Sequence, residues 1–428
     1  FAIWDARRSK LFLSRDRLGV RPLFYTQTAD AFLFASEIKA LFTRATVGHA
    51  LDLQALAQLF TFWVTLPGRT LFKDVRELPP GHSLVVQHGK VCLHRYWQPD
   101  FPADIAPMDE DECAEQLLAL LRDAVKLRLR ADVPVSTYLS GGLDSTVVTA
   151  LLRDTSAASL ETFSVAFDDP EFDESAFQRE AVAHLGTRHT EFRCSYEDIA
   201  RVFPDVIRHT EKPLLRTAPA PMYLLAQQVH RAGGRVVMTG EGADEMLGGY
   251  DIFKEAKIRR FCAAYPDSKR RPLLFKRLYP YLPQLQAQPP AYLQAFFRAR
   301  PKDLGSPFFS HIPRWDSAKQ LDMLLSEGVR AELSGYDVLA DLEAQLPSIY
   351  RRWEPMAQAQ YLETLLLLPG YILSSQGDRV AMAHAVEMRF PFLDHRVVEF
   401  AAGIPARLKM KGLNEKYILK RATRQFVP

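Results

Sequence analysis

The chain has 428 residues, 47% hydrophobic and 25% charged, a composition typical of a globular protein of about two or three domains. Its 54 basic and 51 acidic residues leave a net charge of only +3, which excludes the strongly basic surface of a nucleic-acid-binding or membrane-surface protein. The four cysteines form no paired metal-binding motif and the longest apolar run, residues 362–373, is too short to cross a bilayer, so we expect a reduced, cytoplasmic protein with neither structural zinc nor a membrane span.

Residues 1–98 predict a β-rich domain, because short aromatic and aliphatic runs alternate with polar turns. One helix is expected at residues 52–60, where Asp52 precedes a stripe of leucines at helical spacing. A polar segment with three prolines, residues 99–108, predicts a linker to a second domain, residues 109–428. The expected strands of the first domain are 1–4, 11–14, 23–25, 32–35, 83–87 and 91–96.

The pattern changes after residue 109, where expected helices alternate with expected strands. This alternation predicts a parallel, doubly wound sheet, whose ligands sit at the carboxyl ends of the strands. Residues 251–365 are interpreted as a mostly helical elaboration around that sheet. The expected helices are 112–129, 146–152, 175–185 and 222–231, and the expected strands are 133–138, 160–167, 189–193 and 235–238.

The loop after the strand at 133–138 has the composition of an oxyanion-binding turn. Ser140 precedes Gly141 and Gly142, and Asp144 and Ser145 follow at the start of the next helix. Glycines let backbone N–H groups approach a phosphate closely, and the helix N-terminus adds partial positive charge. The spacing does not fit the Walker pattern. It resembles the SGGxDS loop of N-type ATP pyrophosphatases, which activate a substrate by adenylation.

A second loop, residues 239–245, follows the strand at 235–238 and carries glycines and three carboxylates. Activation of a carboxylate by ATP needs hard oxygen ligands for Mg²⁺. Asp144 and Asp244 are the candidate magnesium ligands, and Glu241 is a candidate general base for an incoming amine.

Two charged segments lie near the end of the chain. The charges of residues 387–394 border an apolar stretch and are either paired structural ions or ligand contacts. Residues 414–420 offer cations for a pyrophosphate leaving group, but a lone lysine on a helix, such as Lys416, usually faces solvent.

These segments together resemble the synthetase domain of glutamine-hydrolysing asparagine synthetase. The resemblance rests on residues 140–145, 239–250, 387–394 and 415–419. Residues 15–25, 35–41 and 77–82 resemble the later half of the glutaminase domain of that family. The resemblance implies part of an αββα N-terminal-nucleophile glutaminase sandwich in residues 1–98. It implies a doubly wound ATP pyrophosphatase domain, truncated at its C-terminus, in residues 109–428.

The resemblance also implies specific roles. Glu241 would serve the acyl-adenylate and amide-forming steps, Lys416 would contact pyrophosphate, and Asp244 would join Asp144 in binding magnesium. Arg389 lies in the segment that lines the acceptor pocket in the family. The implied ATP site consists of Leu139, Ser140, Gly141, Gly142, Asp144, Ser145, Val165, Thr239 and Gly240.

The activity implied is an asparagine synthase (glutamine-hydrolysing) type of ligase reaction, which converts L-aspartate to L-asparagine through an acyl-adenylate. ATP and Mg²⁺ are the implied cofactors, and the partners are small molecules, with ammonia derived from glutamine in the full-length parent. No nucleic-acid or membrane partner is expected, and a homodimer remains open. Two alternatives remain: a related ligase or cyclase acting on another carboxylate, in secondary-metabolite or polysaccharide biosynthesis, and an inactive ligand-binding or assembly homologue.

The chain departs from the family at its beginning, because the family's glutaminase uses an N-terminal cysteine as nucleophile. This sequence begins at Phe1 within an expected strand, and Cys92 and Cys113 do not match the position of that nucleophile. We therefore expect that this polypeptide does not hydrolyse glutamine and that a longer parent does.

Overall fold

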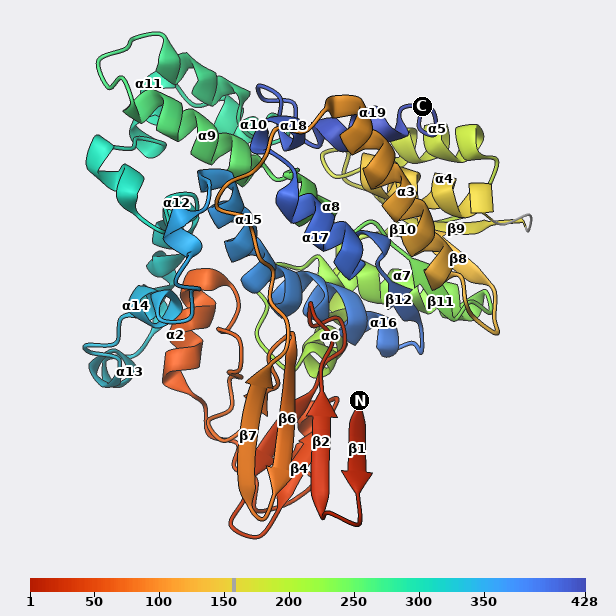
Figure 1. Cartoon of the computed structure of the whole chain (residues 1–428), viewed down its shortest axis with the longest axis vertical. Coiled ribbons are helices and arrows are strands. Elements are labelled where there is room, and N and C mark those ends of the chain that lie inside the picture. Colours follow the sequence, from red (N-terminus) through yellow and green to blue (C-terminus); the bar gives the residue numbers. More distant parts are fainter. Residues whose placement is uncertain (156–158) are drawn as a thin grey trace.

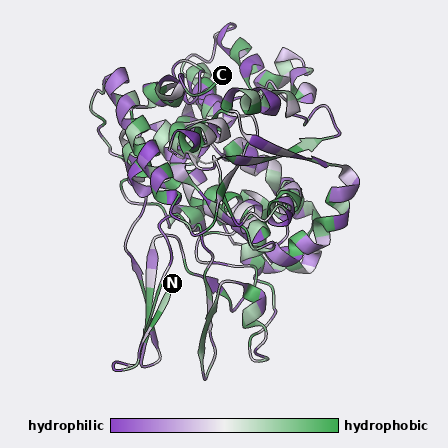
Figure 2. Cartoon of the chain, turned by 90° about the vertical axis from the view of Figure 1, so that its right-hand side faces the viewer, coloured by the Kyte–Doolittle hydropathy of each residue, from purple (hydrophilic) through white to green (hydrophobic). Residues whose placement is uncertain are grey.

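The computed structural model describes residues 1–155 and 159–428, and it has the α/β architecture expected from the sequence. Two antiparallel sheets form the lower part of the molecule in Figure 1, and a parallel sheet with its helices forms the larger body above them. Figure 2 shows the two antiparallel sheets side by side below this body. None of the helices in the two described ranges is long and apolar enough to cross a membrane.

The two antiparallel sheets share a small hydrophobic core. Leu13, Leu78 and Leu84 are fully buried and pack against Tyr25 and Phe32 of the other sheet. The result is a sandwich whose strands confirm the expected ones to within a few residues. One sheet has the order β1 (Ala2–Asp5), β2 (Lys10–Ser14), β6 (His82–Gln87), β7 (Lys90–Arg95), and the other has the order β4 (Phe32–Ala35), β3 (Phe24–Gln27), β5 (Arg76–Glu77).

The parallel sheet of the body confirms the doubly wound architecture. All four neighbouring pairs of strands are parallel. Thr137 lies opposite Met238 in register, so the carboxyl ends of the two central strands are adjacent. The strand order is β10 (Arg188–Cys194), β9 (Glu161–Phe167), β8 (Val135–Tyr138), β11 (Val236–Met238), β12 (Glu387–Arg389).

Polar caps and apolar stripes define the helices around this sheet. The Asp109 side chain accepts hydrogen bonds from the backbone N–H groups of Asp111 and Glu112 and so begins α3. The helix α6, which the sequence analysis did not include, begins with a capping box between Ser195 and Asp198. These helices are α3 (Glu110–Arg128), α4 (Leu143–Thr155), α5 (Ser175–Leu185), α6 (Tyr196–Thr210), α7 (Pro219–Arg231), α8 (Ala243–Leu247), α16 (Arg379–Met382), α17 (His395–Gly403), α18 (Ala406–Lys409) and α19 (Tyr417–Thr423).

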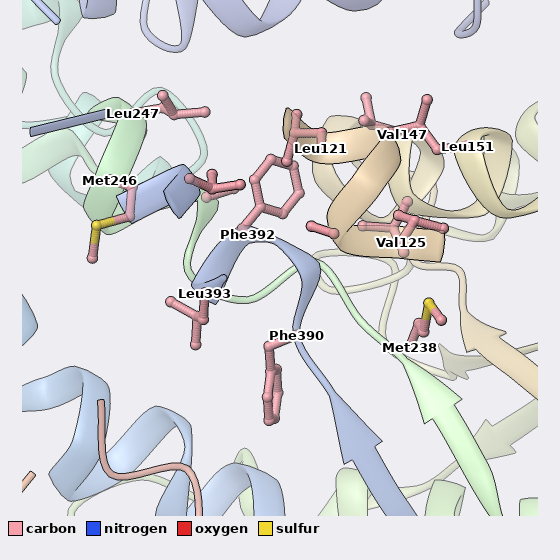
Figure 3. Close-up of a cluster of buried hydrophobic side chains, with 14 of the residues drawn as sticks. Leu121, Val125, Val147, Leu151, Met238, Met246, Leu247, Phe390, Phe392 and Leu393 are labelled. Atoms are coloured by element: carbon pink, nitrogen blue, oxygen red, sulfur yellow. The ribbon is translucent and has the colours of Figure 1, made fainter. Parts of the chain in front are cut away.

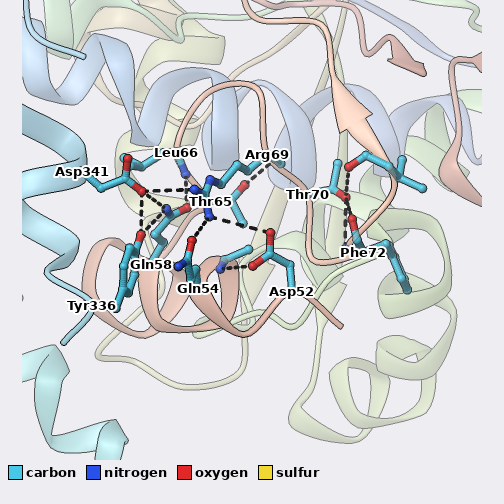
Figure 4. Close-up of polar contacts among 12 residues, drawn as sticks. Asp52, Gln54, Gln58, Thr65, Leu66, Arg69, Thr70, Phe72, Tyr336 and Asp341 are labelled. Atoms are coloured by element: carbon cyan, nitrogen blue, oxygen red, sulfur yellow. Dashed lines mark hydrogen bonds and ion pairs between the residues drawn. The ribbon is translucent and has the colours of Figure 1, made fainter. Parts of the chain in front are cut away.

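Residues 251–365 are mostly helical, as expected, and lie along the left side of Figure 1. They contact α2 (Leu53–Phe62) of the N-terminal part through the polar group of Figure 4. Gln58 donates to the Tyr336 hydroxyl at 2.7 Å and to Asp341 at 3.0 Å. The helices of this region are α9 (Asp251–Ala263), α10 (Pro283–Gln286), α11 (Pro290–Phe296), α12 (Ile312–Ala318), α13 (Glu327–Glu332), α14 (Val338–Glu343) and α15 (Pro355–Leu365).

The main hydrophobic core joins the parallel sheet to helices that precede and follow it within residues 109–428 (Figure 3). Leu121 and Val125 of α3 and Val147 of α4 pack with Met238 and with Phe392 near the end of the chain. Phe392 is completely buried, and truncating such a side chain to alanine costs about 3–5 kcal/mol. This packing fixes the segment after β12 against the carboxyl end of β11.

A buried ion pair joins the N-terminal sandwich to the body. Arg379 pairs with Glu211 and donates to the carbonyl oxygens of Ser36, at 2.7 Å, and His209, at 2.9 Å. The Glu211 carboxylate accepts from two backbone N–H groups at the start of α1 (Ile38–Leu41), at 2.9 and 2.7 Å. Glu211, which belongs to the body, therefore places a negative charge at the N-terminus of α1 in the sandwich and satisfies its free N–H groups.

Replacing Glu211 by alanine should lower the free energy of unfolding by about 3–5 kcal/mol, because it leaves the buried Arg379 charge and two helix amides unpaired. Glu343→Ala is the matched control, since Glu343 pairs with Arg351 at the exposed surface and should cost less than about 1 kcal/mol. Denaturant unfolding of the two variants tests this difference, and equal losses would contradict it.

Candidate active site

The first loop closes on itself through serine hydroxyl groups. The Ser145 hydroxyl accepts from the backbone N–H of Ser140 at 3.1 Å, lies 3.0 Å from the Ser140 hydroxyl and donates to the Gly142 carbonyl at 3.2 Å. The Ser140 hydroxyl also accepts from the Gly142 N–H at 3.3 Å. The loop is thus held as a tight turn between the end of β8 and the first residues of α4, a geometry suited to an anion.

The second loop touches the first, and the contact requires glycine. A Cβ atom at Gly240 would lie 2.8 Å from the Cβ of Asp144 and 2.9 Å from the backbone nitrogen of Ser145. The Thr239 N–H donates to the Arg389 carbonyl at 3.0 Å, which continues the pairing of β11 with β12. Any larger residue at 240 would push apart the two loops that follow the central strands.

Lys416 joins the two loops through their carboxylates. Its ammonium nitrogen lies 2.5 Å from an oxygen of Asp144 and 2.7 Å from an oxygen of Asp244. Its side chain passes directly over Gly249, where a Cβ would lie 2.0 Å from both the Lys416 Cε and an Asp244 oxygen. Lys416 itself precedes α19 in a left-handed backbone conformation.

The pKa values of Asp144, Lys416 and Glu241 are shifted from their usual values. Burial raises the pKa of Asp144 to about 7, against the lowering effect of the Lys416 ammonium. The two carboxylates raise the pKa of Lys416 despite its burial, so the lysine remains charged. Burial also raises the pKa of Glu241, which is a property expected of a side chain that takes up a proton.

A cavity of about 420 Å³ opens beside the two loops. Four buried oxygens that face no hydrogen-bond partner among the described residues lie in its lining: the Tyr138 hydroxyl, Oδ1 of Asp144, Oγ1 of Thr239 and Oε2 of Glu241. Buried oxygens without partners are costly unless a ligand or water satisfies them. Of the residues proposed from the sequence, the lining contains Leu139, Ser140, Asp144, Ser145, Val165, Thr239, Gly240, Glu241 and Asp244.

These residues fit a magnesium–nucleotide complex. Mg²⁺ is usually bound by one or two carboxylates together with phosphate oxygens rather than by a cage of protein ligands. Asp144 and Asp244 provide two carboxylates at one place, and one oxygen of Asp144 is free of protein partners among the described residues. Within the described ranges, no cluster of three or more histidine, cysteine, aspartate or glutamate side chains has metal-binding geometry.

The Arg389 side chain lines a different cavity from the other proposed residues, although its carbonyl pairs with Thr239. Its guanidinium donates to Glu387 at 2.7 Å and to the backbone carbonyls of Arg128, at 2.6 Å, and Arg130, at 3.0 Å. It lines a separate cavity of about 780 Å³ together with residues such as Arg21. In the same segment, Asp394 pairs with Arg128 and Arg396, both at 2.9 Å, so the structure uses these charges as paired ions.

The structure adds lining residues that the sequence analysis missed. Gln178 of α5 accepts from Ser164 at 2.7 Å and donates to the Val165 carbonyl at 2.8 Å, which holds the cavity wall in place. A glutamine inside an amphipathic helix carries no distinguishing pattern. Tyr250 donates to Glu245 at 2.7 Å and follows the glycine pair of the second loop, a signal that could have identified it.

Comparison with known proteins gives matches along the whole chain. The family profile "Asparagine synthase" matches residues 116–428, and the profile "Glutamine amidotransferase domain" matches residues 1–97. "Amidase chyE" of Penicillium rubens is 31% identical over 461 residues, covering 100% of this chain and 67% of the relative. "Asparagine synthetase [glutamine-hydrolyzing] 1" of Bacillus subtilis is 29% identical, covering 100% of this chain and 65% of the relative.

The chain thus spans about two thirds of the length of the curated relatives it matches. An NH3-dependent NAD synthetase from Campylobacter jejuni covers 56% of the chain at 16% identity, with a TM-score of 0.24 that is too low to carry an argument. The profile matches and the relatives over the full chain show that this protein belongs to the asparagine synthase family.

Proposed function

We propose that this protein activates a carboxylate with ATP and converts the acyl-adenylate to an amide with ammonia. The observation that carries the proposal is the joining of the two strand-end loops by Lys416 beside a cavity with unpartnered carboxylate oxygens. L-Aspartate is the acceptor that the family name suggests, and glutamine hydrolysis is the ammonia source suggested by the profile that matches residues 1–97. We also propose the domain division 1–98, 99–108 and 109–428.

The first step is transfer of the adenylyl group. A carboxylate oxygen of the acceptor attacks the α-phosphorus, the bond to the β-phosphate breaks, and pyrophosphate leaves. The Ser140 hydroxyl and the backbone N–H groups of its loop hold the phosphates, and the Lys416 ammonium stabilises the charge that develops on the leaving group. Mg²⁺, held by Asp144 and Asp244, would supply neutralisation of the phosphate charge.

The second step is amide formation. The ammonia nitrogen attacks the activated carbonyl carbon, and the bond between that carbon and the AMP oxygen breaks. The Glu241 carboxylate takes the proton that the attacking nitrogen loses, for which its buried position and raised pKa are suited. Val165 and Leu139 line the cavity with apolar surface on which the adenine can rest.

The direct test is pyrophosphate release from ATP in the presence of ammonia and a panel of carboxylic acids that includes L-aspartate. Release that depends on one acid and is accompanied by its amide supports the proposal. Absence of release with every acid would overturn it.

Glu241→Gln should lower the rate of amide formation by about 10²- to 10⁴-fold, because the variant side chain cannot take up the proton. ATP binding should remain, since the amide keeps the size of the carboxyl group. Product is measured by mass spectrometry and binding by calorimetry. Glu171→Gln, at an exposed turn, is the control. Loss of ATP binding in Glu241→Gln would show that Glu241 holds the nucleotide instead.

Lys416→Met should slow pyrophosphate release by about 10²- to 10³-fold, the usual effect of removing one charge-stabilising group. The variant leaves the carboxylates of Asp144 and Asp244 facing each other without their shared cation. Lys420→Met, within α19, is the control, because Lys420 pairs outside the site, with Asn414 and Glu415. Equal rates in the two variants would remove Lys416 from the mechanism.

A further inference from the structure

A second cavity, of about 570 Å³, adjoins the one beside the two loops. The two cavities share Tyr250 and Ile372 in their linings, so they meet at these residues. The second cavity is lined by residues of α9, α11 and α12, which lie on the same side of the body in Figure 1, and by Trp63 from the end of α2. Its volume is in the range of pockets that enclose drug-sized ligands, far larger than an aspartate molecule needs.

Aromatic side chains dominate the walls of this cavity. Tyr279 stacks on Phe297 with ring centres 6.3 Å apart, and Phe296 meets Phe297 edge to face at 4.9 Å. The Tyr371 side chain is buried, and its hydroxyl has no hydrogen-bond partner in the described part of the chain. Such walls favour a flat apolar ligand, since aromatic rings gain most from stacked or edge-to-face contacts.

The cavity also contains one cation without a carboxylate partner. The Arg216 guanidinium stands over the Trp63 ring at 4.3 Å and makes no ion pair or hydrogen bond within the two described ranges. By contrast, the Arg314 guanidinium in the same lining pairs with Glu363 at 2.7 Å.

The acidic groups of the lining are each paired with a cation of the protein. Glu255 accepts from the Tyr279 hydroxyl at 2.7 Å and pairs with Arg259 at 3.6 Å. Asp251 pairs with Lys254 at 3.2 Å. One oxygen each of Asp251, Glu255 and Glu363 still lacks a hydrogen-bond partner in the described part of the chain. Arg216, a cation of the lining that pairs with none of these carboxylates, is the site for a carboxylate of the ligand.

We propose that this second cavity holds the acceptor and that the acceptor is a carboxylic acid with an aromatic body. This inference rests on the proposed function and narrows its substrate class. The aromatic body lies among Phe296, Tyr279 and Tyr371, Arg216 attracts the carboxylate, and the carboxylate reaches the nucleotide past Tyr250. L-Aspartate has no apolar body with which to fill these aromatic walls.

The experiment compares 3-phenylpropanoate and indole-3-acetate with L-aspartate as acceptors. Binding is measured by calorimetry with Mg²⁺ and a non-hydrolysable ATP analogue, and turnover by pyrophosphate release with ammonia. We expect the aromatic acids to bind at least about 10-fold more tightly than aspartate. Arg216→Gln and Phe296→Ala should each weaken that binding by about 10-fold, since each removes one contact worth about 1.4 kcal/mol.

Two matched controls separate the cavity from the rest of the surface. Arg122 also stands over an aromatic ring, that of Phe426 at 5.1 Å, and Phe261 is a similarly exposed phenylalanine outside both cavities. Arg122→Gln and Phe261→Ala should leave the binding of aromatic acids unchanged.

The outcomes distinguish this inference from the proposed function. Turnover with aspartate but no binding of aromatic acids would overturn the inference and retain the ligase. Binding of aromatic acids that depends on Arg216 and Phe296, with no pyrophosphate release from any acid, would retain the cavity assignment and overturn the ligase. Aromatic binding that is equal in all four variants would place the ligand elsewhere and overturn the inference.

Discussion

The ammonium group of Lys416 joins two carboxylates that come from separate loops of the parallel sheet, and the geometry of the site depends on this contact. Asp144 follows β8, Asp244 follows β11, and Lys416 arrives from the end of the chain. Two carboxylates this close would repel each other without a shared cation, and burial would drive one of them to take up a proton. The lysine thus keeps two anions beside a cavity in which a magnesium–nucleotide complex can replace part of its role.

The close approach of the loops depends on the backbone as well as on the charges. Gly240 permits contact with Asp144, and Gly249 leaves room for the Lys416 side chain. The adjoining cavity has a different character, with one unpaired guanidinium, within the described residues, among many aromatic side chains. In our account the two cavities divide the work between them: the loops provide the electrostatic environment for adenylation, and the aromatic walls select the carboxylate.

Sequence patterns predicted the parts of this site that are formed by residues contiguous in the chain. The strand–loop–helix pattern around Ser140 and the glycine-rich turn around Gly240 are contiguous in sequence, and both loops lie at adjacent strand ends. The Lys416 contact spans 272 residues and was suggested only by resemblance, because a lysine before a helix has no distinguishing period. The strand β12 has three residues and a single buried side chain, Met388, too short for an alternating pattern. The aromatic cavity draws residues from distant parts of the chain, between Trp63 and Ile372, and no sequence pattern connects them.

We propose above all that an acceptor carboxylate attacks the α-phosphorus of ATP in the cavity beside Lys416. The most direct measurement uses the acceptor acid that supports turnover, labelled with ¹⁸O in its carboxylate, and follows the label by mass spectrometry. Our account predicts that one labelled oxygen appears in AMP, because the bond between the carboxylate oxygen and the α-phosphorus persists when the amide forms. Label in inorganic phosphate, with ADP as the nucleotide product, would show attack at the γ-phosphorus and contradict the account.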